Sequence, residues 1–331
     1  MRAPESRPIV LEWGSDRASA EVLNRLEFET LSDQHQVVEI ADLVLKERRR
    51  RHLFGERFTY QLRDVVFDPC SGVPFLGGRP ICESHSVPIE QLMYLTPTRL
   101  RPKEHVSGPA TGVSGTSYYH FLLEQLPAAL RAREVCDSLS VIRWRDSPEF
   151  VTTACELLFQ ACLSVDQVAS VGDYWLAGQG RDSGYPHPRD VEVLREATRE
   201  YRATPSQIRL FVPRSGFGRA PEGEKGLASR LADEHGFRVF DSTKRNWLEQ
   251  IDLFSQAEVV VGVHGGALAN LVFCGPNARV VEILPLTRVV SCFANLARVL
   301  ELDYRSLLLA PERDNAYGDI STVEDEIMRL L

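Results

Sequence analysis

The stretch AEVVVGVHGGALANLVF, residues 257–273, decides how the second half of this 331-residue chain folds. It begins with an apolar, β-branched run typical of a buried strand, and a His-Gly-Gly triplet separates this run from an apolar helical segment that begins at Ala267. A helix that starts directly after a strand has first-turn amides without intrahelical partners, at the positive end of the helix dipole. The turn therefore predicts a site for a phosphate group.

A simpler interpretation of the same residues stays open. Two glycines after a strand also make an ordinary tight βα turn, and His264 can cap a helix or sit in the core. The chain has neither a P-loop with its lysine nor a complete G-x-G-x-x-G fingerprint, so a nucleoside triphosphatase or a dinucleotide oxidoreductase is not favoured.

The residues after 204 alternate between strand and helix patterns. Strands are predicted at 208–212, 237–240, 259–263, 280–284 and 304–308, and helices at 224–235, 246–256, 267–273 and 289–300. This alternation predicts a parallel sheet with helices on both faces, whose ligands bind at the carboxyl edge of the strands. Glu282 lies near that edge.

The first half of the chain is less regular. Short strands at 64–68, 73–76 and 80–83, with a Gly77-Gly78 hairpin, make a β-rich lead-in over about 63–107. Further on, we expect a loop at 108–115, helices at 32–51, 118–135, 148–163 and 188–202, and strands at 140–143, 167–171 and 174–176. A linker at 204–206 divides the chain into an N-terminal domain (1–203) and a C-terminal domain (204–318). The segment 319–331 carries a last helix that crosses back to the first domain.

Composition restricts the class of protein. A net charge of −8 and a pI of about 5.6 argue against a nucleic-acid partner. The basic run at 46–51 is a solvated helix end or, alternatively, a contact for anionic lipid that would bring a peripheral membrane association. Seven cysteines without a C-x-x-C pair, no apolar leader and no membrane-spanning run predict reduced thiols in a cytoplasmic protein.

Two groups of side chains are candidates for chemistry. His120 and Glu124 are four residues apart on one face of the helix at 118–135, where they can act as a general base, or as a base and its orienter, or form a plain surface pair. Arg214 ends the first strand of the C-terminal domain, where its guanidinium suits a phosphate, and Arg219 follows in the loop. Gln250 lies on the preceding helix. No metal-ligand motif is present in the sequence.

These segments together resemble the glycosyltransferase family 61 group. The resemblance runs from about 64 to 308 and rests on motifs in a fixed order: Tyr119-His120-x-x-x-Glu124, Val212-Pro-Arg214, Glu249-Gln-Ile251, residues 257–270 and Val281-Glu-Ile-Leu-Pro285. After Arg219 the chain departs from the family, since Ala220-Pro221 replaces its usual basic-apolar pair.

The resemblance implies an α/β, GT-B-like architecture, with two Rossmann-like parallel-sheet domains facing a cleft. It implies an inverting transferase that moves a sugar from a nucleotide-sugar donor, commonly UDP-linked, to a hydroxyl of a glycan or other acceptor. No metal or other cofactor is expected. The catalytic candidates are Glu124 and His120. The donor-binding candidates are Arg214, Arg219, His264, Gly265, Gly266, Ala267, Asn270, Glu282 and Gln250.

Two alternatives of other classes compete with this hypothesis. One is an inactive nucleotide-sugar-binding scaffold or sensor, which would bind the donor without turnover. The other is a phosphate-handling hydrolase, but the sequence has no G-x-S-x-G elbow and no cluster of Asp and His ligands. The sequence names neither the sugar, the acceptor nor the oligomeric state.

Overall fold

The structure is a computed structural model that describes residues 36–38, 59–81, 101–115, 117–177, 186–214, 220–285, 290–309, 319–321 and 323–331. The described residues form two compact units. The N-terminal unit holds those from 59 to 199, and the C-terminal unit holds 36–38 together with those from 200 onward. Arg219 and the basic run at 46–51 lie outside the described residues.

The C-terminal unit is built on a parallel sheet. Its strands are β9 (Ile208–Val212), β10 (Phe237–Val239), β11 (Ala257–Val263), β12 (Arg279–Pro285) and β13 (Asp303–Leu309). They are ordered β10-β9-β11-β12-β13, and β1 (Gln36–Val38) adds an antiparallel edge beside β13. The chain order of the parallel strands thus reverses between β9 and β11. Ligands of doubly wound sheets bind at such a switch point.

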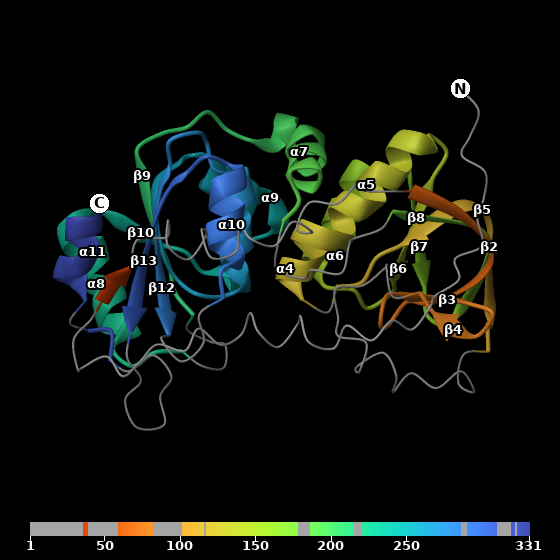
Figure 1. The fold of residues 1–331 in the computed structure, drawn as a ribbon, viewed down its shortest axis with the longest axis horizontal. Helices are drawn as coiled ribbons and strands as arrows, with labels where there is room; N and C mark the ends of the chain where they lie inside the picture. The colour runs from red at the N-terminus through yellow and green to blue at the C-terminus, as the bar shows by residue number, and fades with distance from the viewer. Residues whose placement is uncertain are drawn as a thin grey trace. The chain divides into compact units, whose positions relative to one another are not determined.

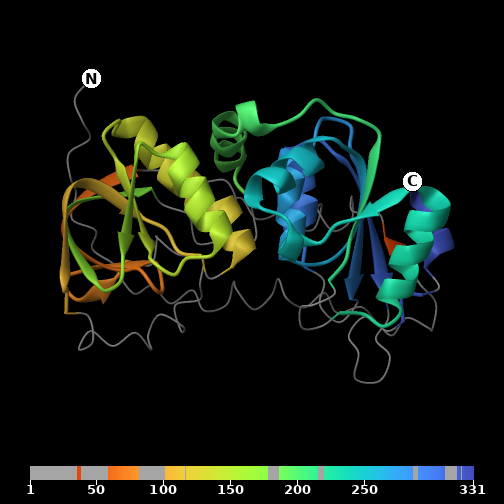
Figure 2. The same cartoon turned by 180° about the vertical axis from the view of Figure 1, so that it is seen from behind.

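Helices cover both faces of this sheet, as expected for a Rossmann-like fold. The helices α8 (Glu224–His235) and α11 (Glu324–Leu330) lie on one face, and α9 (Trp247–Ser255) and α10 (Cys292–Val299) lie on the other (Figure 1 and Figure 2). Short 3-10 helices, η6 (Ser242–Lys244) and η7 (Gly266–Phe273), complete the unit. Alternate strand residues such as Val259, Val261 and Val263 pack against α8 and α11.

Local signals in the sequence explain where these helices begin and end. Asn246 and Glu249 form a capping box at the start of α9, with both side-chain-to-backbone hydrogen bonds at 2.9 Å. Gly236 ends α8 in the left-handed conformation, with φ of 68°. The expected strand 208–212 and helix 224–235 are therefore confirmed at both ends.

The N-terminal unit contains a mixed seven-stranded sheet of order β4-β3-β2-β8-β5-β6-β7. The lead-in strands β2 (Thr59–Asp68), β3 (Val73–Leu76) and β4 (Arg79–Pro80) are antiparallel, and β2 joins them to the rest through β8 (Ala169–Ala177). The strands β5 (Glu104–Gly112), β6 (Ser140–Trp144) and β7 (Ala161–Val165) run parallel beyond β8. The helices are α4 (Tyr118–His120), η4 (Phe121–Gln125), α5 (Leu126–Val135), α6 (Glu149–Leu158), α7 (Pro188–Ala197) and η5 (Arg199–Tyr201).

Long-range strand pairing overrides several local predictions. The expected loop at 108–115 is largely strand β5, because a bulge with Gly108 at φ of 86° lets the Gly-Pro pair stay in the sheet. The end of the expected helix at 148–163 is β7, which pairs with β6. The strands expected at 167–171 and 174–176 are one strand, β8, because β2 pairs along both.

The expected helix at 32–51 is also wrong where the structure describes it. Residues 36–38 form β1, whose backbone pairs with β13 from Ser306 to Leu308. A strand partner 270 residues away leaves no periodic signal in the local sequence. Within the described part of the chain, no helix combines the length and the apolar character needed to span a bilayer.

Candidate active site

Close packing surrounds the end of β11, before the turn. A side chain at Gly262 would lie 2.6 Å from Leu268 and 3.2 Å from Val212, so only glycine fits there. The amide of His264 continues the sheet by donating to the carbonyl of Ile283 at 2.9 Å. Helix η7 begins when Leu268 donates to the carbonyl of Gly265 at 3.0 Å. The amides of residues 265–267 lie between the two amides that make these bonds. They belong to the first turn of η7, the part of a helix that binds anions.

Arg214 lies at the same switch point, because β9 and β11 are neighbours in the sheet. Its Nη1 donates a hydrogen bond to the carbonyl oxygen of His264, and its backbone amide donates to the buried carboxylate of Glu224 at 2.5 Å. A Cβ on Gly265 would lie 3.1 Å from Arg214 Nη1, so the guanidinium closely approaches the turn. The structure thus brings together Arg214 and the His-Gly turn, which are 50 residues apart.

A buried carboxylate orients His264. Nδ1 of His264 lies 2.5 Å from Oε1 of Glu282, whose side chain is completely buried. The other carboxylate oxygen of Glu282 accepts a hydrogen bond from the hydroxyl of Tyr304. Burial, followed by the charge of Glu282 and this hydrogen bond, raises the pKa of Tyr304 well above its ordinary value. Because the side chain of Glu282 is completely buried, its carboxylate is not exposed for direct contact with a ligand.

Asn270 and Gln250 also lie beneath the turn rather than at its surface. Nδ2 of Asn270 donates to Oε1 of Gln250 at 3.0 Å and to the carbonyl of Ala267 at 3.1 Å. Gln250 in turn donates to the carbonyl of Arg245 at 3.2 Å. Both amide side chains are buried, so they fix the turn and η7 against α9 from within.

The His120 and Glu124 pair lies in the N-terminal unit on a widened helical turn. Nδ1 of His120 is 2.8 Å from Oε2 of Glu124, and the side chain of Glu124 is only 11% exposed. Burial lowers the pKa of His120, but the hydrogen bond and charge of Glu124 outweigh it, so the net pKa lies above 6.5.

Pro127 explains why this turn is a π-helix. Proline cannot donate to the carbonyl four residues earlier, and its ring would clash with it, so the turn η4 just before it is wider than an α-turn. The buried amide of Ser114 donates to Oε1 of Gln125 at 2.6 Å and fixes this turn to the segment after β5. Such π-turns are frequent at functional sites.

Sequence reasoning missed several supporting residues. Tyr304, Glu224 and Asp190 were placed only as strand or helix members, yet each has a buried polar role; Asp190 accepts from Nε of Arg131 at 2.7 Å and holds α7 against α5. No local pattern marks them, because each partner is distant in the chain.

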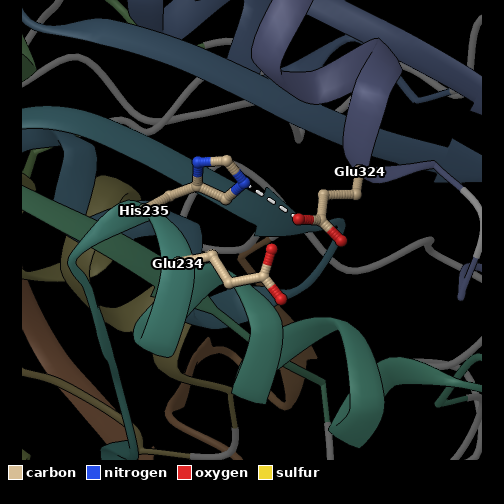
Figure 3. A group of neighbouring side chains, drawn as sticks. All are labelled: Glu234, His235 and Glu324. Atoms are coloured by element: carbon tan, nitrogen blue, oxygen red, sulfur yellow. Dashed lines mark hydrogen bonds and ion pairs between the residues drawn. The ribbon is translucent and has the colours of Figure 1, made fainter.

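One group of described side chains lies close enough to be tested as a metal site. Glu234, His235 and Glu324 bring their ligand atoms within 4.8 Å of one another at the end of α8 and the start of α11 (Figure 3). However, Arg230 Nε already lies 2.6 Å from Oε2 of Glu324, and His235 Nε2 lies 2.9 Å from Oε1. Arg230 and His235 of α8 and Glu324 of α11 therefore form a polar latch between the two helices.

Comparison with known proteins finds a family model that matches part of this chain. Residues 118–281 match the family model described as Glycosyltransferase 61, a segment that includes the His120–Glu124 pair, Arg214 and the His264 turn. The class of protein that this segment resembles is therefore a glycosyltransferase. This segment of the chain belongs to the glycosyltransferase 61 family, as the sequence motifs indicated.

A curated relative supports the same class. The chain is 26% identical over 141 residues to Beta-1,2-xylosyltransferase RCN11 from Oryza sativa subsp. japonica. This match covers 37% of the chain and 25% of the relative, so the chain spans about a quarter of that protein's length.

Proposed function

We propose that this protein is an inverting glycosyltransferase that moves a sugar from a UDP-linked donor to a hydroxyl of a glycan or other acceptor, in polysaccharide or glycoconjugate synthesis. The observation that carries the proposal is the meeting of Arg214 and the His264 turn at the switch point of a Rossmann-like sheet, within the family-matched segment. A GT-B arrangement of the two units is part of the proposal.

In this proposal the C-terminal unit binds the donor diphosphate. The guanidinium of Arg214 and the first-turn amides of Gly266 and Ala267 neutralise the charge that develops as the nucleoside diphosphate departs. Glu282 and Tyr304 act one step further away, since they fix the ring of His264. Because arginine and backbone amides supply the neutralisation, we propose that no bound metal is needed.

The N-terminal unit supplies the base. Either Glu124, or His120 oriented by Glu124, removes the proton of the acceptor hydroxyl as its oxygen attacks the anomeric carbon from the face opposite the diphosphate. The pH dependence of activity distinguishes these two possibilities, because the pKa of His120 is raised above its ordinary value. If His120 is the base, activity falls as pH drops through a value above 6.5, where the imidazole becomes protonated. Activity that persists well below pH 6.5 would instead assign the role to Glu124.

The decisive experiment combines binding and turnover. A thermal-shift panel of nucleoside diphosphates and their sugar conjugates identifies the donor base, because a ligand that binds only the native state raises the midpoint. Glu124→Gln is then expected to reduce transfer by about a hundredfold or more while nucleotide binding is kept. Glu134→Gln, on the exposed face of α5, is the matched control and should leave both unchanged.

Each possible outcome has a defined meaning. Stabilisation by one nucleotide without turnover on any acceptor would favour the inactive scaffold over the enzyme. A flat panel would contradict both. Loss of activity with EDTA that a divalent cation restores would contradict the metal-independent mechanism.

A further inference from the structure

The polar latch between α8 and α11 does not use one carboxylate that lies beside it. Glu234 precedes His235 at the end of α8, and its carboxylate points toward the contact between His235 and Glu324 (Figure 3). The ligand atoms of these three residues all lie within 4.8 Å of one another. None of the ion pairs between described residues includes Glu234. A second carboxylate therefore approaches the imidazole without a cation of its own.

The other two members of the group are well fixed. The side chains of His235 and Glu324 are only 27% and 17% exposed, and Nε2 lies 2.9 Å from Oε1. The two residues are 89 positions apart, so only the fold brings them together. Their helices pack against one apolar core, in which Ile327 of α11 and Leu227 of α8 are buried. Two helix ends thus place an imidazole nitrogen and a carboxylate oxygen side by side.

Arg230 orients the carboxylate of Glu324 without engaging the oxygen that faces His235. Its Nε donates to Oε2 of Glu324 at 2.6 Å, and its Nη2 donates to the carbonyl oxygen of Ser321. Oε1 is the oxygen in contact with His235. In metal sites, a hydrogen bond to the other oxygen of a carboxylate ligand orients that ligand. Arg230 therefore supports a ligand oxygen at Oε1 and does not compete for it.

We propose that His235, Glu234 and Glu324 bind a zinc ion through Nε2 and one oxygen of each carboxylate. Zinc takes imidazole nitrogen at about 2.0–2.1 Å and carboxylate oxygen at about 2.0–2.2 Å, and water supplies the remaining ligand. Magnesium and calcium prefer oxygen ligands alone, so the imidazole selects against them. This ion takes no part in the proposed transfer, and the site shares no residue with the donor and base sites.

The contact between His235 and Glu324 is close to the geometry that zinc requires. Tetrahedral bonds of about 2.1 Å place neighbouring ligand atoms about 3.4 Å apart. Nε2 and Oε1 are 2.9 Å apart, so a small separation of the two side chains admits the ion. The longer distances in the group, up to 4.8 Å, involve Glu234, whose exposed side chain is free to move inward.

Zinc takes the place of the proton in the hydrogen bond between Nε2 and Oε1. The lone pair of Nε2 binds the metal, and the proton that Nε2 carried is released to solvent, or Nδ1 takes up a proton in its place. The metal then joins the end of α8 to the start of α11. Because the ion binds only the folded protein, it should stabilise the protein and the docking of α11 in particular.

The test uses the full chain, treated with EDTA and then dialysed to remove both chelator and metal. A micromolar excess of ZnCl2 should raise the thermal midpoint by several degrees, whereas MgCl2 at the same concentration should not. Hydrogen-exchange mass spectrometry should show that Zn²⁺ slows the exchange of the α11 amides.

Glu234→Gln is the decisive variant, because it removes one ligand and leaves the polar latch intact. We expect it to weaken Zn²⁺ binding in isothermal titration calorimetry by about tenfold or more and to abolish the shift in midpoint. Asp233→Asn is the matched control, since it removes an exposed carboxylate one position earlier in α8. This control should bind Zn²⁺ as the wild type does. His235→Gln should lose binding as Glu234→Gln does.

Several results would overturn the proposal. Zn²⁺ that leaves the midpoint of the wild type unchanged would do so, as would a Glu234→Gln variant that keeps the full shift, because the ion would then bind elsewhere. An equal loss in Asp233→Asn would mean that the negative charge of the helix end, and not a ligand set, attracts the ion. An equal shift with Mg²⁺ would remove the role of the imidazole.

Discussion

At the scale of single residues, Arg214 is the side chain whose position depends most clearly on the fold. It follows a buried strand, its amide is fixed by Glu224 and its guanidinium by the carbonyl of His264. These two contacts orient the guanidinium in the absence of a ligand, which lowers the entropic cost of the diphosphate binding that we propose.

We expect Arg214→Ala to weaken the binding of the nucleoside diphosphate by about 2 kcal/mol, or roughly thirtyfold in Kd, because a charge-assisted hydrogen bond is lost. Isothermal titration calorimetry measures this loss. Arg238→Ala removes the same charge from an exposed position on β10 and is the control. Equal effects of the two variants would show that net charge, and not this site, determines binding.

At the scale of secondary-structure elements, the contact between α8 and α11 is a polar latch above an apolar interface. Ile327 is buried against the same core as Leu227 and Leu231 of α8. Glu324 joins the two helices by accepting a hydrogen bond from His235 (Figure 3). It also accepts one from Arg230. The hydrogen bond from Arg230, opposed by burial and aided by His235, lowers the pKa of Glu324 below 4.5.

This latch should stabilise the protein in a pH-dependent manner. A carboxylate whose pKa is lower in the folded state contributes stability above its ordinary pKa and loses it as pH falls through the folded value. We therefore expect Glu324→Gln to lower stability at pH 7 by about 1 kcal/mol, and the difference from wild type to shrink below pH 4.5.

Thermal midpoints at pH 7 and pH 3.5 measure this effect. Asp325→Asn removes an exposed carboxylate from the same first turn and keeps the effect on the helix dipole comparable. If Asp325→Asn destabilises as much as Glu324→Gln, the dipole and not the latch accounts for the loss.

At the scale of the whole molecule, the chain returns to complete its own sheet. Residues 36–38 pair with β13 of the C-terminal unit, although residues 59–199 between them build the other unit. The edge of β13 would otherwise present unpaired backbone groups, which favour pairing with other chains.

We expect deletion of residues 1–51 to speed hydrogen exchange at the β13 amides from 306 to 308, because their strand partner is removed. Hydrogen-exchange mass spectrometry compares these amides with those of β11 in the middle of the sheet, which serve as the internal reference. Unchanged protection of β13 relative to β11 would contradict the pairing of β1.

The sequence by itself determined the C-terminal unit and its turn. Continuous apolar runs, the Asn246 cap, Gly236 and the glycines after β11 are short-range signals, and they specified most strands and helices within a residue or two. The helix expected at 289–300 begins three residues later, at Cys292. The four-residue spacing of His120 and Glu124 also placed them on one helical face, since such a spacing needs no tertiary information.

Only the tertiary structure decided the features that depend on distant partners. Pairing between separate segments produces the strands β1, β5 and β7 and the support of His264 by Glu282 and Tyr304. The physical reason is that a hydrogen bond between strands or a buried polar contact needs a partner from a distant segment. The local periodicity of hydrophobic residues does not depend on that partner and so does not reveal it.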